Sequence, residues 1–149
     1  MNGSASDRPV LFAYDGSDFA KAAIEVAARE LPAGRPAIVI TVWQPLEAIP
    51  FGGLAAAGTN EEVDKGVEEQ AMQVAEEGAE LAKATGFDAK PLTERGTPTW
   101  RSIVDAADEK DASLIVLGSH GRTGIMELML GSVAGAVASH TKRAVLIAH

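Results

Sequence analysis

Five short runs of apolar residues alternate with longer stretches in which apolar residues recur every three or four positions. The runs are Val10 to Tyr14, Ala37 to Trp43, Ala89 to Glu94, Leu114 to Leu117 and Ala144 to Ala148. Strand patterns that alternate with helix patterns are typical of a parallel sheet with helices on both faces. The sequence therefore predicts an open, five-stranded α/β fold.

The composition of each run indicates its place in the sheet. The first, second and fourth runs are nearly continuous in apolar residues, as expected of strands that are buried on both faces. The third run contains Lys90, Pro91, Thr93 and Glu94. Because proline lacks the N–H that a central strand would donate, we expect this third run at an edge of the sheet.

Two helices are expected to follow the first two strands. Ser17 can cap a helix that ends near Leu31. Thr59 and Glu62 have the spacing of a capping box, and the helix that they open is expected to end at Gly86. This second helix is rich in acidic residues, which we interpret as a solvated face and not as a binding site.

Two further helices and one long loop complete the predicted elements. Thr97-Pro98 opens the third helix, with Pro98 expected in its first turn. Gly131-Ser132 opens the fourth, which runs to about His140. The loop from Pro45 to Gly58 is too long for a simple connection, and a binding loop and plain disorder both remain open for it.

A glycine pattern follows the fourth apolar run. Gly118, Gly121, Gly131 and Ser132 have the spacing Gly-x-x-Gly, nine residues, Gly-Ser. Glycines allow close backbone approach, and the first N–H groups of the following helix lack helical partners, so the loop can hold an anion. The alternative is that the glycines only permit a tight turn and close packing, with Ser132 as an ordinary helix cap.

A phosphate alone would not give tight binding at such a loop. One helix terminus stabilises an anion by about 0.3–2 kcal/mol, whereas micromolar affinity needs about 8 kcal/mol. In an open parallel sheet, ligands lie beyond the carboxyl ends of the strands, where residues 15–18, 42–43 and 118–132 are expected to meet. The loop therefore predicts a nucleotide pocket, in which a base or sugar is also buried.

Two charged residues at this edge have more than one interpretation. Asp15 can accept hydrogen bonds from ribose hydroxyls or a base amino group, or help to hold Mg²⁺, and it can equally be a turn residue before Ser17. Arg122 is a candidate for phosphate binding, although a solvent-facing role is the simpler interpretation. His120, His140 and His149 do not have the spacing of metal ligands, and we predict no metal site.

Composition limits the class of protein. A chain of 149 residues fits one domain, expected over residues 9–149 after a flexible tail at residues 1–8. The net charge of −8 and the lack of a basic cluster argue against a nucleic-acid surface. The absence of cysteine, of an apolar leader and of any long apolar stretch leads us to expect a soluble, cytoplasmic protein with no membrane contact.

The chain resembles the universal stress protein family over nearly its whole length. The matching segments are Val10 to Ser17 (VLFAYDGS), Gly96 to Pro98, Leu114 to Arg122, Leu130 to Val133 and Ala144 to Ile147. In that family the glycine pattern marks the members that bind ATP. The resemblance implies a Rossmann-like sheet ordered 3-2-1-4-5, of the adenine nucleotide alpha hydrolase kind.

The resemblance also implies roles for single residues. Asp15 and the backbone of Val42 would contact the adenine or the ribose, and Gly118 the ribose and the phosphates. The residues that would hold the phosphates are Gly121, Gly131, Ser132 and Val133. Two further residues would line the pocket, Ala13, where some relatives have proline, and Leu117, where methionine is frequent.

The function implied is that of an ATP-binding regulatory protein of the stress response. AMP and cyclic AMP share the adenosine part and are alternatives, and Mg²⁺ is expected to accompany ATP. An enzyme, at most a slow ATPase or another user of adenine nucleotides, and a nucleotide-free scaffold are the competing functions; we predict no catalytic residue and an unidentified regulatory protein partner. Because the last strand, Ala144 to Ala148, is an apolar edge, we expect a homodimer through it.

Overall fold

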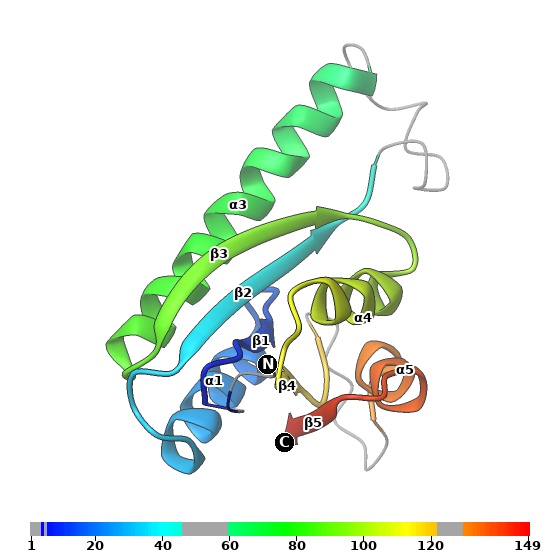
Figure 1. Cartoon of the computed structure of the whole chain (residues 1–149). Coiled ribbons are helices and arrows are strands. Elements are labelled where there is room, and N and C mark those ends of the chain that lie inside the picture. Colours follow the sequence, from blue (N-terminus) through cyan, green and yellow to red (C-terminus); the bar gives the residue numbers. More distant parts are fainter. Residues whose placement is uncertain (1–3, 5, 46–59, 122–129) are drawn as a thin grey trace.

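The protein contains a five-stranded parallel sheet in the order β3-β2-β1-β4-β5 (Figure 1). The computed structural model describes residue 4 and residues 6–45, 60–121 and 130–149. The strands are β1 (Val10–Ala13), β2 (Pro36–Trp43), β3 (Asp88–Arg95), β4 (Leu114–Gly118) and β5 (Ala144–Ala148). The predicted number of strands, their order and the edge position of the proline-bearing strand are confirmed.

Two pairs of helices cover the two faces of the sheet. Helices α1 (Asp18–Glu30) and α3 (Asn60–Ala84) cover one face, and α4 (Thr99–Glu109) and α5 (Ser132–His140) lie on the other side (Figure 1). Successive side chains of β1 alternate between the two cores: Phe12 packs with the first pair of helices and Leu11 with the second. The central strands are thus buried on both faces, as their apolar runs indicated.

The predicted N-terminal cap is confirmed for α1, whereas the predicted position of Pro98 in α4 is wrong. Ser17 caps α1, and its Oγ accepts a hydrogen bond of 3.2 Å from the N–H of Ala20. Pro98 is the N-cap of α4 and not, as expected, a residue of its first turn, because its ψ of 157° is extended. The φ that proline imposes suits both positions, so the residue type alone cannot distinguish them.

Two other predictions fall partly or wholly outside the described residues. Thr59, the first residue of the predicted capping box, is not among the described residues, and neither is the loop 46–58. Helix α3 ends at Ala84, two residues before Gly86, whose φ of +112° explains why the chain has glycine there.

Gly78 allows α3 to approach the sheet closely. A Cβ at this position would lie 2.6 Å from Cδ1 of Tyr14 and 2.8 Å from Cγ1 of Val39. This contact fixes α3 against β1 and β2. The 25 residues of α3 span about 37 Å, whereas the eight residues of β2 span about 26 Å, so the helix extends beyond the sheet (Figure 1).

The opposite end of the sheet is held by arginine contacts. Arg8 donates to the backbone oxygen of Ala112 at 3.2 Å and forms an ion pair of 3.2 Å with Asp111. Arg143 pairs with Asp108 at 2.8 Å and with Asp111 at 3.1 Å. These contacts tie the segment before β1 and the start of β5 to the end of α4. None of the helices in the described ranges is long and apolar enough to cross a membrane.

Candidate functional site

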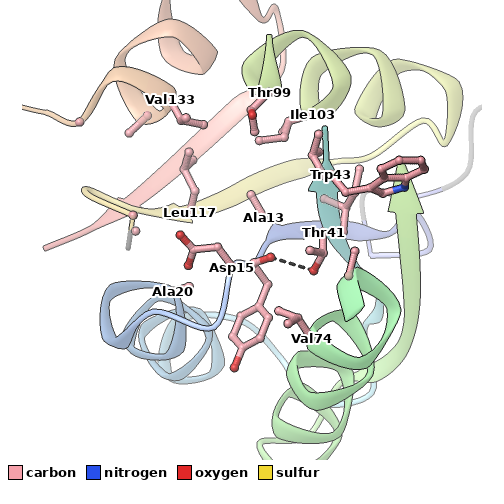
Figure 2. A pocket seen from close by; sticks show the side chains of 18 of the residues that line it. Ala13, Asp15, Ala20, Thr41, Trp43, Val74, Thr99, Ile103, Leu117 and Val133 are labelled. Atoms are coloured by element: carbon pink, nitrogen blue, oxygen red, sulfur yellow. Dashed lines mark hydrogen bonds between the residues drawn. The ribbon is translucent and has the colours of Figure 1, made fainter. Parts of the chain in front are cut away.

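A cavity of about 1180 Å³ opens where the central strands end (Figure 2). Its lining includes every predicted site residue that the structure describes: Ala13, Asp15, Val42, Leu117, Gly118, Gly121, Gly131, Ser132 and Val133. Arg122 lies outside the described residues. The described parts of the three segments expected to converge at the carboxyl edge of the sheet therefore do so.

One side of the cavity is formed by residues 118–121 and 131–133, which we call the glycine wall. Gly118 ends β4 directly against the start of α1, where a Cβ would lie 2.8 Å from the backbone carbon and oxygen of Phe19. Gly131 lies equally close to the neighbouring loop, because a Cβ there would be 2.8 Å from the oxygen of Ser119. Both glycines are thus required by packing, whatever the cavity binds.

The N–H of Gly131 is engaged within the protein. It donates a hydrogen bond of 2.7 Å to the oxygen of Ser119, outside the helix, so this N–H is not one of the donors left for an anion. The donors that remain belong to the first turn of α5, where Ser132, Val133 and Ala134 line the cavity. Their N–H groups have no acceptor inside the helix, and the helix dipole makes this end positive.

Gly121 and Asp15 bring the loops after β4 and β1 together. A Cβ on Gly121 would lie 2.9 Å from Oδ2 of Asp15. The other carboxylate oxygen, Oδ1, accepts a hydrogen bond of 2.9 Å from the N–H of Ser17 and shapes the turn before α1. The turn role considered for Asp15 is therefore confirmed, and its carboxylate also lies among the cavity residues beside Leu117 (Figure 2).

The opposite side of the cavity is formed by residues 67–77 of α3, which we call the helix wall. The end of β2 continues this wall with Thr41, Trp43 and Gln44. The helix wall was not predicted, because its acidic residues were interpreted as a solvated face. A signal was present: the apolar positions Val67, Ala71 and Val74 continue beyond the length of helix that the strands can cover.

A hydrogen bond joins the helix wall to β1 and α1. The hydroxyl of Tyr14 donates to Oε1 of Glu77 at 2.7 Å, and Nζ of Lys21 lies 3.5 Å from the same oxygen. Burial of the phenol, together with the nearby Glu77 carboxylate, raises the pKa of Tyr14 far above its ordinary value. The same hydrogen bond lowers the pKa of Glu77. The pair is therefore a neutral phenol on a carboxylate anion.

A second contact fixes the backbone at the end of β1. The buried hydroxyl of Thr41 donates to the oxygen of Tyr14 at 2.8 Å, as the dashed line in Figure 2 shows. The N–H of Tyr14 in turn donates to the oxygen of Ile40 at 2.9 Å. The backbone that leads into Asp15 is thus held by β2.

The charges around the cavity are mostly acidic. Asp15 and Glu77 line it, and its described lining includes no lysine and no arginine. Within the described part of the chain there is also no group of three or more His, Cys, Asp or Glu side chains that could hold a metal ion. An anionic group bound here would therefore depend on main-chain N–H groups and on the positive end of α5.

The apolar part of the lining lies between the two walls. Ala13, Leu117 and Ile103 form a surface in the middle of the cavity (Figure 2). A flat aromatic group could be buried on this surface, while polar atoms attached to it reach Asp15 or the glycine wall. Cavities of this kind, mostly apolar with a few fixed polar groups, are typical of small-molecule sites.

Comparison with known proteins identifies relatives over nearly the whole chain. The family model described as the universal stress protein family matches residues 8–149. Universal stress protein YxiE of Bacillus subtilis is 32% identical over 154 residues, which cover 93% of this chain and 96% of that protein.

Solved structures share the fold. The hypothetical protein MJ0577 of Methanocaldococcus jannaschii superposes with a TM-score of 0.78 over 96% of both chains, and at 24% identity this likeness concerns the fold alone. A universal stress protein solved in complex with cAMP has a TM-score of 0.63 and 27% identity, with 97% of this chain and 98% of that chain covered. The chain described here belongs to the universal stress protein family.

Proposed function

We propose that this protein binds an adenine nucleotide in the cavity and acts as a regulatory module of the stress response. The observation that carries the proposal is the convergence of Asp15, Gly121 and the first turn of α5 at one cavity. The relative solved in complex with cAMP supports an adenine nucleotide as the ligand. ATP, with Mg²⁺ on its phosphates, is the nucleotide that the glycine pattern favours; AMP and cyclic AMP are the alternatives.

The base and the ribose would occupy the middle of the cavity. Ala13, Val42 and Leu117 supply apolar surface for an adenine ring. The carboxylate of Asp15 would accept hydrogen bonds from ribose hydroxyls, and backbone groups of Val42 would meet the edge of the base. Burial of the adenosine part supplies the affinity that a phosphate contact alone lacks.

The phosphates would lie against the glycine wall. The N–H groups of Ser132 and Val133 stand at the positive end of α5, and each hydrogen bond to a charged oxygen contributes about 1.5–3 kcal/mol. Two such bonds and the helix terminus give about 3–8 kcal/mol. Together with a buried base, this range is sufficient for micromolar binding, which needs about 8 kcal/mol.

Regulation fits this site better than rapid catalysis. Phosphoryl transfer depends on cations that stabilise the transition state and on a group that positions the attacking water. The described lining contains neither lysine nor arginine. We therefore expect a bound nucleotide to change the conformation or the partner of the protein, with at most slow hydrolysis.

Titration calorimetry with ATP and Mg²⁺, AMP, cyclic AMP and adenosine tests the proposal. Binding heat and a change in the fluorescence of Trp43, which lines the cavity, are expected with at least one nucleotide. No heat with any of the four compounds would contradict the proposal and favour a nucleotide-free scaffold. Many turnovers of ATP per protein would favour an enzyme instead. Mass spectrometry of the co-purified ligand would then identify the nucleotide.

We also propose a homodimer through β5. The oxygen of Ala148 accepts a hydrogen bond from the N–H of Ser119, the residue that follows β4. Along a parallel strand, the backbone groups of successive residues point alternately to one neighbouring strand and to the other side. The backbone groups of Val145 and Ile147 therefore face the outer edge, where no described strand pairs with them. A second copy of β5 would cover this edge.

The proposed function also includes a regulatory protein partner and a cytoplasmic location. The location is proposed from the cysteine-free composition.

Two proline variants test the dimer. Val145→Pro removes an N–H at the outer edge and is expected to give a folded monomer in sedimentation at micromolar concentration. Leu146→Pro removes an N–H that faces β4 and is expected to lower the stability of the fold itself. A wild-type monomer at the same concentration would contradict the proposed dimer.

A further inference from the structure

His120 differs from every other described residue around the cavity. It is the only side chain of the described lining that can carry a positive charge, and the acidic residues Asp15 and Glu77 share this lining with it. Its position in the sequence is inside the Gly-x-x-Gly segment, directly before Gly121. A donor at this place is adjacent to the main-chain groups that would meet a phosphate.

Two contacts hold the imidazole ring, and Gly131 lies close to it. Its Nδ1 lies 3.0 Å from Oγ of Ser119, and its centroid lies 5.2 Å from that of the Phe19 ring at an angle of 51°. Its Cδ2 lies 3.7 Å from the place that a Cβ on Gly131 would occupy. The ring is therefore held between the first turn of α1 and the N-terminus of α5, beside the glycine wall.

Ser119 determines which ring nitrogen remains for a ligand. Only 1% of this residue is exposed, its N–H donates to Ala148 and its oxygen accepts from Gly131. Its hydroxyl is therefore the group that meets Nδ1 of His120. When the hydroxyl donates to Nδ1, the neutral ring carries its proton on Nε2, and when the ring is protonated both nitrogens carry one. Nε2–H is a donor in both of these states, whereas a neutral ring with its proton on Nδ1 would present Nε2 as an acceptor.

We infer that His120 donates its Nε2–H to a phosphate oxygen of the bound nucleotide and so makes the site select nucleotides over nucleosides. The inference rests on the proposed function, because it assumes that the phosphates lie at the glycine wall. A phosphate in a cavity lined by two carboxylates gains from a donor that can be charged. Adenosine lacks the group that this donor would meet.

Two substitutions separate the two nitrogens of the ring. In His120→Asn the side-chain amide reaches about as far as Nδ1 and can keep the contact with Ser119, but nothing replaces Nε2. In His120→Gln the amide reaches about as far as Nε2 and can keep the donor. Calorimetry with AMP and with adenosine on the wild type and both variants measures the contribution of each nitrogen, and thermal unfolding shows that each variant is folded.

The expected result is a loss that depends on the phosphate. His120→Asn should weaken AMP binding by about 10- to 100-fold, the size of a hydrogen bond to a charged group, and leave adenosine binding within about threefold of wild type. His120→Gln should restore most of the AMP affinity. Ser119→Ala, which releases the ring, should lower AMP affinity by less than His120→Asn does.

Three results would overturn the inference. Wild-type AMP affinity in His120→Asn would mean that Nε2 meets no phosphate. Equal losses for AMP and adenosine would mean that the ring acts only through packing on Phe19 and Gly131. If the wild type bound neither compound, nor ATP, the proposed function itself would fail. If the wild type binds AMP but His120→Asn discriminates AMP from adenosine as well as the wild type does, the proposed function stands and only the role of His120 fails.

Discussion

The two walls of the cavity are built on different principles. The glycine wall is made mainly of main chain, and its shape requires residues without a Cβ. At Gly118 and Gly131 an added Cβ would lie 2.8 Å from the backbone of another segment. The helix wall is made of side chains, and Tyr14 and Glu77 join it to the sheet by a hydrogen bond of 2.7 Å. Substitutions that add atoms should therefore disturb the glycine wall, whereas exposed side chains of the helix wall can be replaced.

On the glycine wall, any enlargement should affect the fold or the ligand. On the helix wall, exposed residues such as Gln70 and Gln73 can be replaced without disturbing another segment. The difference also separates two tasks. Main-chain N–H groups can bind an anion whatever the conformations of the surrounding side chains. Specificity for the rest of a ligand then depends on side chains.

The largest effect is expected for Gly118→Ala. The new Cβ would meet the backbone of Phe19, which cannot move without shifting α1, and such overpacking costs about 1–3 kcal/mol of the free energy of unfolding. Urea unfolding measures it. Gly66→Ala in α3 is the matched control, because a Cβ there meets no atom within 4 Å and alanine favours a helix. An equally stable Gly118→Ala protein would contradict the close packing.

The next effect concerns the ligand and not the fold. In Gly121→Val the new Cβ would meet only Oδ2 of Asp15, the end of a side chain, and the valine adds bulk between the two loops. Nucleotide affinity should therefore fall by more than about tenfold, with a smaller change in stability than in Gly118→Ala. Gln73→Ala on the helix wall should change the affinity by less than about threefold. Undiminished binding by Gly121→Val would place the ligand elsewhere.

A smaller effect is expected at the link between the helix wall and the sheet. Tyr14→Phe removes the hydrogen bond to Glu77 and should lower the free energy of unfolding by about 1 kcal/mol. The pKa of Glu77 should rise toward its ordinary value in this variant, because the donor that lowers it is lost. Titration of the Glu77 carboxyl by NMR measures the change, and an unaltered pKa would contradict the contact.

Tyr14 also predicts how stability changes at alkaline pH. Its pKa in the folded protein lies above the ordinary value of 10.0, so the folded state holds the phenolic proton more tightly than the unfolded state. The resulting stability is fully present below pH 10 and is lost as the pH rises further. Tyr14 is the only tyrosine, so phenolate absorbance reports it alone; ionisation at or below its ordinary pKa would contradict its burial.

Most of the fold followed from local patterns in the sequence. The strands were recognisable because burial on both faces requires continuous apolar runs, and Ser17 caps α1 because a serine at that place satisfies a helix N–H whatever surrounds it. Pro98 was misplaced by one position, since the φ of proline is the same at the N-cap and in the first turn. Only ψ, which the fold determines, distinguishes the two.

The site was predicted less completely because half of it depends on distant contacts. Glu77 meets Tyr14 across 63 residues, and an acidic residue on a helix has the same local pattern whether it faces water or a phenol. The spacing of Gly131 could not show that its N–H is bonded to Ser119. The spacing did predict that Gly118, Gly121 and Gly131 lie together, and they line one cavity because the two strands that precede these loops are neighbours in the sheet.

Amide chemical shifts measured by NMR during a titration with AMP, and again with adenosine, test most directly whether the glycine wall holds a phosphate. We expect the amides of Gly121, Ser132 and Val133 to shift strongly with AMP and weakly with adenosine, while the amide of Gly66 in α3 stays in place with both. Equal shifts with the two compounds, or shifts confined to residues 67–77 of the helix wall, would contradict the account.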